Sequence, residues 1–83
     1  MANDYAHIGE RLRAVRTGFT DLLQAEFADR HGFNEDQYGS WERGSRRVTV
    51  EAAEKISDVY GLSLDWIYRG RRDGLSEKVS KIV

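Results

Sequence analysis

The chain has 83 residues with a formal net charge of −1; 33% of its residues are charged, 40% are hydrophobic, and it contains neither cysteine nor proline. This length suits one small domain, and the lack of cysteine excludes a disulfide framework and a thiolate metal site. No apolar run reaches membrane-spanning length and no signal-peptide pattern opens the chain, so we expect a cytoplasmic protein with no membrane partner.

The first predicted helix begins after Asn3 or Asp4, either of which can cap it. Apolar residues then recur at helical spacing and predict one buried stripe. These residues are Tyr5, Ile8, Leu12 and Val15. The helix is expected to end near residues 17–18.

A second helix is predicted after Asp21, which can act as its N-cap with Gln24 as the reciprocal partner three residues later. Its expected buried positions are Leu22, Leu23, Phe27 and Ala28. Gly32 follows where the helix must stop and turn, a position that often requires a positive φ.

A third helix is predicted from about residue 35 to residue 41. Asn34 can cap it, and Gln37 lies three residues further on, as in a capping box. Tyr38 and Trp41 are three residues apart and should face the core. Two short helices joined by a glycine turn form a helix-turn-helix, which places one helix in a DNA groove.

The second half of the chain predicts two further helices and a tail. Thr49 can cap a helix over residues 50–60, and Ser63 can cap another over residues 64–69. Apolar positions in the longer helix are Ala52, Ala53, Ile56, Val59 and Tyr60. The tail, residues 75–83, has apolar residues at helical spacing and is either a sixth helix or frayed.

These patterns predict an all-α fold with five helices, or six if the tail is helical. We assign residues 1–74 to a helix-turn-helix domain and residues 75–83 to a short C-terminal tail. The apolar residues of the tail leave three alternatives open: packing on the same domain, formation of a homodimer, or fraying.

Five short motifs in order resemble the XRE-type helix-turn-helix regulators, a family that includes phage repressors and Cro-like proteins. The motifs are Ile8-Gly9-Glu10-Arg11-Leu12-Arg13, Gln24-Ala25-Glu26-Phe27-Ala28, Gly32, Trp41-Glu42-Arg43-Gly44 and Gly61-Leu62-Ser63-Leu64-Asp65-Trp66-Ile67. The resemblance implies a compact, lambda-repressor-like domain and a sequence-specific transcriptional regulator, a phage- or prophage-like repressor. Its implied partner is double-stranded DNA, and a homodimer would read a palindrome.

The resemblance also implies roles for particular residues. Gln24 matches a glutamine that contacts the DNA backbone, and Arg16 and Glu42 match a partly buried ion pair. The positions that would face bases are Glu35, Asp36, Gln37 and Ser40. Acidic residues are unusual there, although a carboxylate can accept a hydrogen bond from cytosine N4. Acids in the first turn also stabilise a helix without any ligand.

The charged residues of the helix-turn-helix support two different interpretations of its function. Residues 21–44 contain two arginines and six acidic residues, a net charge of −4. This acidity favours an alternative function: a protein-interaction or antitoxin-like accessory module with weak or no DNA binding. Three arginines near the end of the third helix favour DNA binding. Their position would let them contact phosphate, whereas the alternative is a loop that contacts only solvent. They are Arg43, Arg46 and Arg47.

Little in the sequence indicates an enzyme or a ligand site. The two histidines, His7 and His31, have no obvious second metal ligand beside them. No nucleophile elbow and no glycine-rich phosphate loop is present. We therefore expect no catalytic activity, no metal, no cofactor and no small-molecule ligand.

Overall fold

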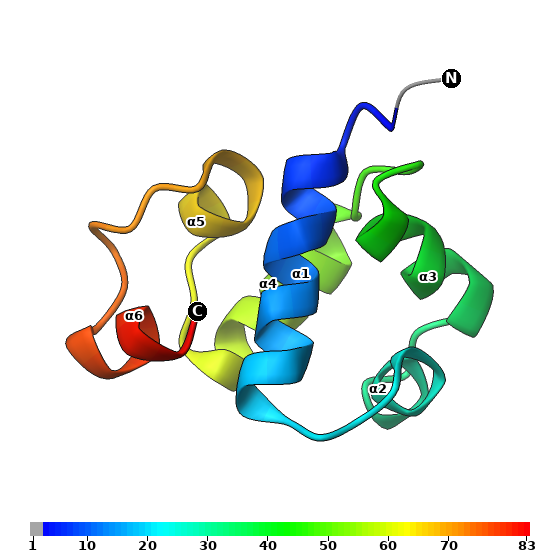
Figure 1. Cartoon of the computed structure of the whole chain (residues 1–83), viewed down its shortest axis with the longest axis horizontal. Helices are drawn as coiled ribbons and strands as arrows, with labels where there is room; N and C mark the ends of the chain where they lie inside the picture. The colour runs from blue at the N-terminus through cyan, green and yellow to red at the C-terminus, as the bar shows by residue number, and fades with distance from the viewer. Residues whose placement is uncertain (1–2) are drawn as a thin grey trace.

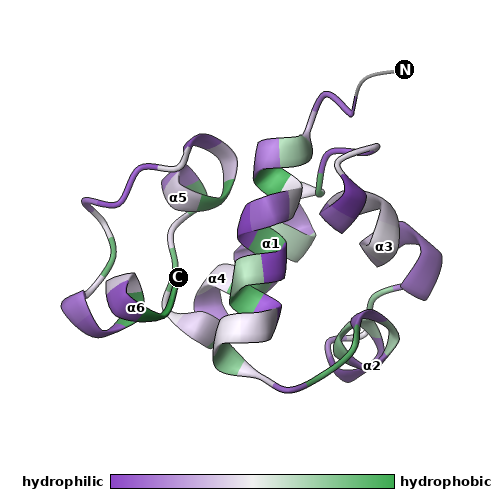
Figure 2. Ribbon diagram, viewed as in Figure 1, coloured by the Kyte–Doolittle hydropathy of each residue, from purple (hydrophilic) through white to green (hydrophobic). Residues whose placement is uncertain are grey.

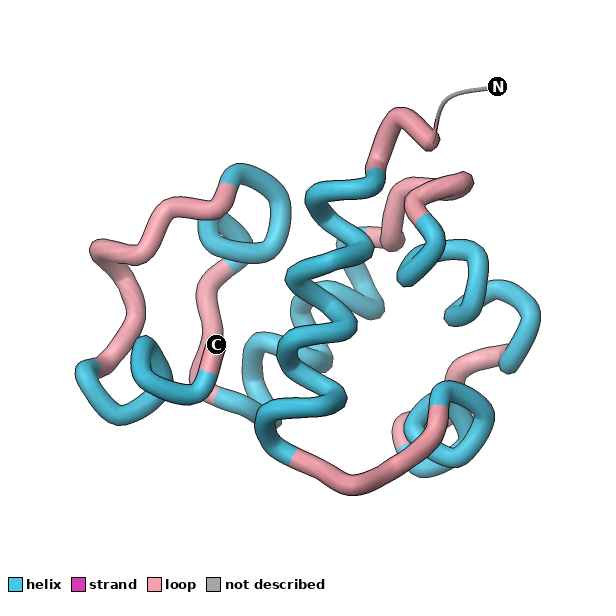
Figure 3. Tube along the Cα trace, in the orientation of Figure 1, coloured by secondary structure: helices cyan, strands magenta, loops and turns pink. Residues whose placement is uncertain are grey.

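The structure is a computed structural model that describes residues 3–83 and is helical, with six helices and no strand in this range (Figure 3). The first three helices are α1 (Ala6–Phe19), α2 (Gln24–Arg30) and α3 (Glu35–Arg43). They are followed by α4 (Val50–Tyr60), α5 (Leu64–Arg69) and α6 (Glu77–Ile82). The predicted all-α fold is confirmed, and the tail is helical. No helix in the described range is long and apolar enough to cross a membrane.

Helix α1 is the central element of the fold (Figure 1). It packs against α3, α5 and α6, while α2 packs against α3 and α4 against α5. Figure 2 shows both hydrophobic and hydrophilic positions recurring along α1, as expected for an amphipathic helix. Its buried residues are Ile8, Gly9, Leu12 and Val15, so the predicted stripe is correct except for Tyr5, which is exposed.

The core is formed mainly by aromatic and branched aliphatic side chains. Its largest fully buried members are Tyr38, Phe27, Leu12, Ile56, Ile67 and Val15. Trp41 and Trp66 are also buried. The prediction that Tyr38 and Trp41 face inward is therefore confirmed, and these rings tie α3 to the core rather than offering surfaces for base stacking.

Polar side chains fix where most of the helices begin. Asn34 Oδ1 accepts a hydrogen bond from the Gln37 backbone N–H at 2.9 Å, and Thr49 Oγ1 accepts one from Ala52 at 3.2 Å. Ser63 Oγ accepts one from Trp66 at 3.0 Å. These three N-caps were predicted from the sequence. Each satisfies a backbone donor that the first turn of a helix leaves free.

The start of α2 differs from the prediction. Leu23 occupies the N-cap position in place of Asp21, and the Glu26 side chain accepts the Leu23 backbone N–H at 2.9 Å. Leucine has no side-chain acceptor, so only the reciprocal half of a capping box forms here. The Leu23 side chain is 69% exposed, so its predicted burial is wrong. Burial of Val59 is also wrong, since its side chain is 54% exposed.

Two glycines allow helices to turn or approach closely. Gly32 has a φ of 76° between α2 and α3, in the left-handed region where a side chain would be strained. Gly9 lies where α1 crosses the end of α3: a Cβ at this position would lie 2.2 Å from the Glu42 carbonyl oxygen. Only a residue without a side chain permits this crossing.

The tail packs on its own domain. Helix α6 lies against α1, and a Cβ at Gly18 would meet Ile82 Cγ2 at 2.9 Å. Val79, Ile82 and Val83 are half-buried. Of the three alternatives for the tail, the structure therefore shows intramolecular packing.

Candidate nucleic-acid interface

A buried polar network joins α1, α2 and α3. The Glu42 carboxylate lies at its centre. Arg16 Nε donates to Glu42 Oε2 at 2.8 Å and Arg16 Nη2 donates to Oε1 at 3.0 Å, a bidentate ion pair. The Arg16 and Glu42 side chains are 11% and 2% exposed. Tyr38 Oη also donates to Glu42 Oε2, and Arg16 Nη1 donates to the Leu22 carbonyl at 2.9 Å. Residues far apart in the sequence thus meet in one charged cluster.

The charge state of Glu42 follows from this environment. Burial by itself would raise the pKa of the carboxyl group, because it removes water from the charged form. Hydrogen bonds from Arg16, Tyr38 and Gln24 outweigh that effect and lower the pKa below its ordinary value. Burial and the neighbouring carboxylate raise the pKa of Tyr38. Glu42 is therefore ionised and Tyr38 is a neutral donor at neutral pH.

Gln24 belongs to the same network. Its Nε2 donates to Glu42 Oε1 at 2.9 Å, so one of its two amide N–H groups is engaged inside the protein. Within the described residues the second amide hydrogen of Gln24 forms no hydrogen bond. The network therefore positions Gln24 at the start of α2, beside the helix that carries the predicted base-contacting residues.

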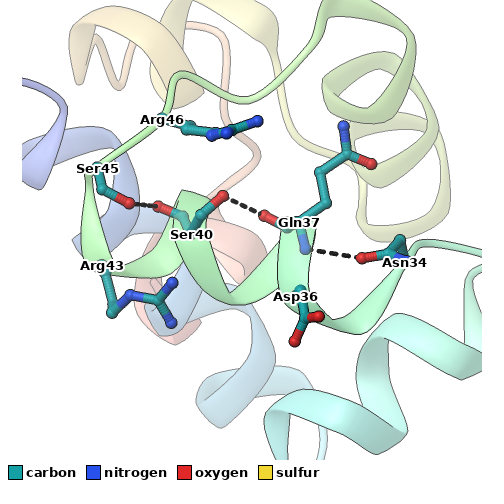
Figure 4. Close-up of a pocket in the computed structure, with 7 residues that line it drawn as sticks. All are labelled: Asn34, Asp36, Gln37, Ser40, Arg43, Ser45 and Arg46. Atoms are coloured by element: carbon teal, nitrogen blue, oxygen red, sulfur yellow. Dashed lines mark hydrogen bonds between the residues drawn. The ribbon is translucent and has the colours of Figure 1, made fainter.

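The exposed side of α3 has a shallow hollow of about 360 Å³. Its lining is polar and charged: Asn34, Asp36, Gln37, Ser40, Arg43, Ser45 and Arg46. Figure 4 shows Arg43 and Arg46 on either side of Ser40, with Asp36 and Gln37 one turn nearer the start of the helix. The structure thus brings together five predicted DNA-contacting residues, three proposed for bases and two for phosphate.

Three of the four predicted base-contacting residues are exposed: Glu35, Asp36 and Gln37. Ser40 differs, because it is 7% exposed and its Oγ donates to the Gln37 carbonyl at 2.6 Å. Its hydroxyl is therefore engaged within α3, although the residue still lines the hollow. Glu35 and Asp36 lie in the first turn of α3, where the helix dipole favours negative charge.

The three predicted phosphate-contacting arginines have different surroundings. Within residues 3–83, neither Arg43 nor Arg46 forms an ion pair or donates a side-chain hydrogen bond. The Arg47 guanidinium instead lies over the Tyr68 ring, with Arg47 Cζ 4.4 Å from the ring centroid, and it does not line the hollow. Tyr68 is in turn fixed by donating to the Val48 carbonyl at 2.8 Å. Arg47 therefore faces α5, away from the exposed side of α3.

Two polar contacts near this site could not be predicted from the sequence. Lys55 of α4 donates to the His31 carbonyl, and His31 Nε2 lies 2.8 Å from Tyr60 Oη. These contacts join the turn before α3 to α4. Arg11 similarly donates to the Ile67 carbonyl at 3.0 Å. Hydrogen bonds from long side chains to distant carbonyls leave no periodic pattern, so sequence reasoning could not find them.

The fold and the exposed α3 define a helix-turn-helix protein. A family model described as helix-turn-helix matches residues 20–67, more than half of the chain, and the chain belongs to this family. The predicted XRE-type resemblance is thereby confirmed, as is the first of the two predicted functions: the protein is a DNA-binding transcriptional regulator.

Two relatives are similar over most of this chain. Control protein C.MunI from Mycoplasma sp is 35% identical over 60 residues, which cover 72% of this chain and 81% of that protein. The SPbeta prophage-derived uncharacterized HTH-type transcriptional regulator YonR from Bacillus subtilis (strain 168) is 31% identical over 64 residues. That match covers 75% of this chain and 56% of the longer relative. No solved structure matches the chain.

Proposed function

We propose that this regulator is a phage-like repressor that reads a specific DNA sequence by placing α3 in the major groove. The observation that carries the proposal is the hollow along α3, where exposed Asp36 and Gln37 lie beside two arginines that have no side-chain partner within residues 3–83. Unpaired guanidinium groups beside polar side chains suit a polyanion whose bases also present hydrogen-bonding groups. A repressor of this kind would act by occupying DNA that other proteins need.

We assign base recognition to the N-terminal end of α3. Gln37 can form a bidentate contact with adenine, and the carboxylates of Glu35 and Asp36 can accept from cytosine N4. Ser40 contributes through shape and through contact with its neighbours, because its hydroxyl is already used by the Gln37 carbonyl. The acidic residues therefore predict half-sites that contain cytosine.

Backbone contacts are assigned to the flanks of α3. Arg43 lies beside the start of α2: a Cβ at Gly39 would meet Arg43 Nη1 at 3.1 Å and Gln24 Oε1 at 3.5 Å. Arg43 and the second amide N–H of Gln24 would thus face the same side of the helix. Cationic and amide donors together suit one DNA phosphate. Arg47 would reach phosphate only by leaving the Tyr68 ring.

The proposed repressor binds as a homodimer. Two copies related by a two-fold axis would place two α3 helices about 34 Å apart, one turn of DNA, and so read a palindrome. Helix α6 packs on α1 of the same chain, but none of its residues is fully buried. Sedimentation with and without a palindromic duplex tests this assembly. A single chain bound to each palindrome would contradict it.

Selection from random double-stranded DNA at low salt tests the proposed recognition. We expect enrichment of one motif, and loss of that motif for the double variant Asp36→Ala, Gln37→Ala. The double variant Arg13→Ala, Asp65→Ala is a matched control. It alters the same number of exposed residues, but both lie outside α3. Failure of the unaltered protein to enrich any motif would disprove sequence-specific binding.

A further inference from the structure

We propose that Arg46 reads a guanine base rather than gripping the phosphate backbone. This inference rests on the proposed placement of α3 in the major groove. It adds a specificity-determining residue that lies outside the helix and that the sequence pattern had assigned to phosphate.

The loop after α3 folds back onto the helix and fixes the position of Arg46. The backbone N–H groups of Ser45 and Arg46 both donate to the Ser40 carbonyl, at 3.1 and 3.3 Å. Ser45 Oγ donates to the same oxygen at 3.2 Å. Gly44, with a φ of 81°, permits the reversal of the chain. These contacts hold the Arg46 backbone against the end of α3.

From this anchor the Arg46 side chain runs along α3 toward Gln37. Figure 4 shows the guanidinium above Ser40, on the opposite side of that residue from Arg43. Arg43, Arg46 and Gln37 all line the hollow, but only Arg43 also lies near Gln24 at the start of α2. The two arginines therefore face different parts of the DNA: Arg43 lies with a proposed phosphate contact and Arg46 with a proposed base contact.

Within the described residues the Arg46 guanidinium has no hydrogen-bond acceptor, no ion-pair partner and no aromatic ring. Its neighbour Arg47 is held over Tyr68, so the two adjacent side chains have separate roles. A guanidinium that lies along the exposed face of a groove-binding helix meets base edges before it meets phosphate. The fork of donors in arginine matches guanine O6 and N7, the commonest specific contact in the major groove.

The test compares Arg46→Ala and Arg46→Lys with the unaltered protein on the motif selected from random DNA. The binding panel consists of that motif, every single base-pair substitution of it, and an unrelated duplex. Arg43→Ala serves as the matched control for a phosphate contact. Thermal unfolding of each variant shows that the fold is retained, which is expected because the Arg46 side chain is exposed.

We expect Arg46→Ala to weaken binding to the motif by about 5- to 150-fold and to abolish discrimination at one guanine. Affinity for the unrelated duplex should change far less. Arg46→Lys should keep the charge and the salt dependence but weaken the discrimination, because a lysine lacks the rigid planar fork of arginine. Arg43→Ala should weaken binding to all duplexes alike and flatten the salt dependence.

Two results would overturn the inference in different ways. If the unaltered protein discriminates among sequences and Arg46→Ala keeps that discrimination at every guanine of the motif, Arg46 does not read a base and the proposed function stands. The same conclusion follows if Arg46→Ala weakens binding to all duplexes equally. If the unaltered protein shows no discrimination, the proposed function and this inference both fail.

Discussion

Gln24 and Glu42 are joined by a hydrogen bond of 2.9 Å between the amide Nε2 of α2 and the carboxylate Oε1 of α3. The sequence had placed these two residues in separate roles, Gln24 as a phosphate contact and Glu42 as the partner of Arg16. The structure makes them members of one network. Because Glu42 also holds Arg16 of α1, the ion pair that stabilises the three-helix junction also positions a proposed DNA-contacting side chain.

Replacing Glu42 should destabilise the fold strongly. In Glu42→Gln the buried Arg16 guanidinium keeps its charge but loses its counterion, so we expect a loss of about 3–5 kcal/mol in the free energy of unfolding. Urea denaturation measures this loss. Glu10→Gln is the control, since its contact with His7 involves side chains that are 76% and 87% exposed. Equal effects of the two substitutions would show that the buried network is unimportant.

Stability should fall as the pH drops below about 6.5 because of His31. Burial, with a smaller effect from the positive charges of Lys55 and Arg30, lowers the pKa of His31 below its ordinary value of 6.5. In acid the unfolded chain therefore binds a proton before the folded protein does. The contribution of His31 is present above pH 6.5 and is lost as the pH falls toward the lower folded-state pKa.

Unfolding by urea at several pH values measures this dependence, with His31→Gln as the comparison. The variant cannot titrate at this position, so its free energy of unfolding should vary less with pH in this range. An identical slope for both proteins would exclude His31 as the cause.

Adding one methyl group at Gly9 should separate α1 from α3. A Cβ there would lie 2.2 Å from the Glu42 carbonyl oxygen and 2.6 Å from that of Trp41, and neither backbone atom can move independently of α3. The expected loss for Gly9→Ala is about 1–3 kcal/mol or more from overpacking, against a gain of about 1 kcal/mol in helix propensity.

Gly39→Ala is the matched control for Gly9→Ala, because it makes the same change inside a helix. Its Cβ would first meet Arg43 Nη1 at 3.1 Å, the end of a flexible side chain. This variant should therefore be neutral or slightly stabilised in thermal unfolding. A Gly9→Ala protein as stable as Gly39→Ala would contradict the close crossing of α1 and α3.

Changing Asp36 should change which base pair is preferred. A carboxylate accepts from cytosine N4, whereas asparagine can bind adenine through a donor and an acceptor. We therefore expect Asp36→Asn to shift the preference at one position from cytosine toward adenine and, by removing a negative charge near phosphate, to strengthen binding to all duplexes. Selection from random DNA measures both effects. Asp65→Asn, on the exposed surface of α5, is the control.

Local sequence signals predicted most helix boundaries correctly. The caps Asn34, Thr49 and Ser63 act within three residues of themselves, and glycines end α3, α4 and α5 in the left-handed conformation. The start of α2 was predicted wrongly because tertiary contacts outweighed a local preference. Asp21 is a good capping residue, yet α2 begins after Leu23, where Glu26 accepts the free N–H and Arg16 binds the Leu22 carbonyl.

In the candidate site, too, local signals predicted some features and distant contacts decided the others. Which residues lie near the start and end of α3 follows from the helical period, and the family motifs indicate that this helix meets DNA. The separate directions of Arg43, Arg46 and Arg47 did not follow, because adjacent loop residues have no period that assigns their faces. The Ser40 carbonyl holds Arg46 along α3, and the Tyr68 ring holds Arg47 toward α5.

The sequence by itself determined the helical class, the order of the helices and the family, because amphipathic spacing, caps and turn glycines act over a few residues. The tertiary structure alone decided which long polar side chains meet. Burial of Glu42 forced Arg16, Tyr38 and Gln24 to converge on one carboxylate, since a buried charge must be paired and hydrogen-bonded. It also decided that α6 packs on α1 and that Arg43 and Arg46 line the hollow beside α3.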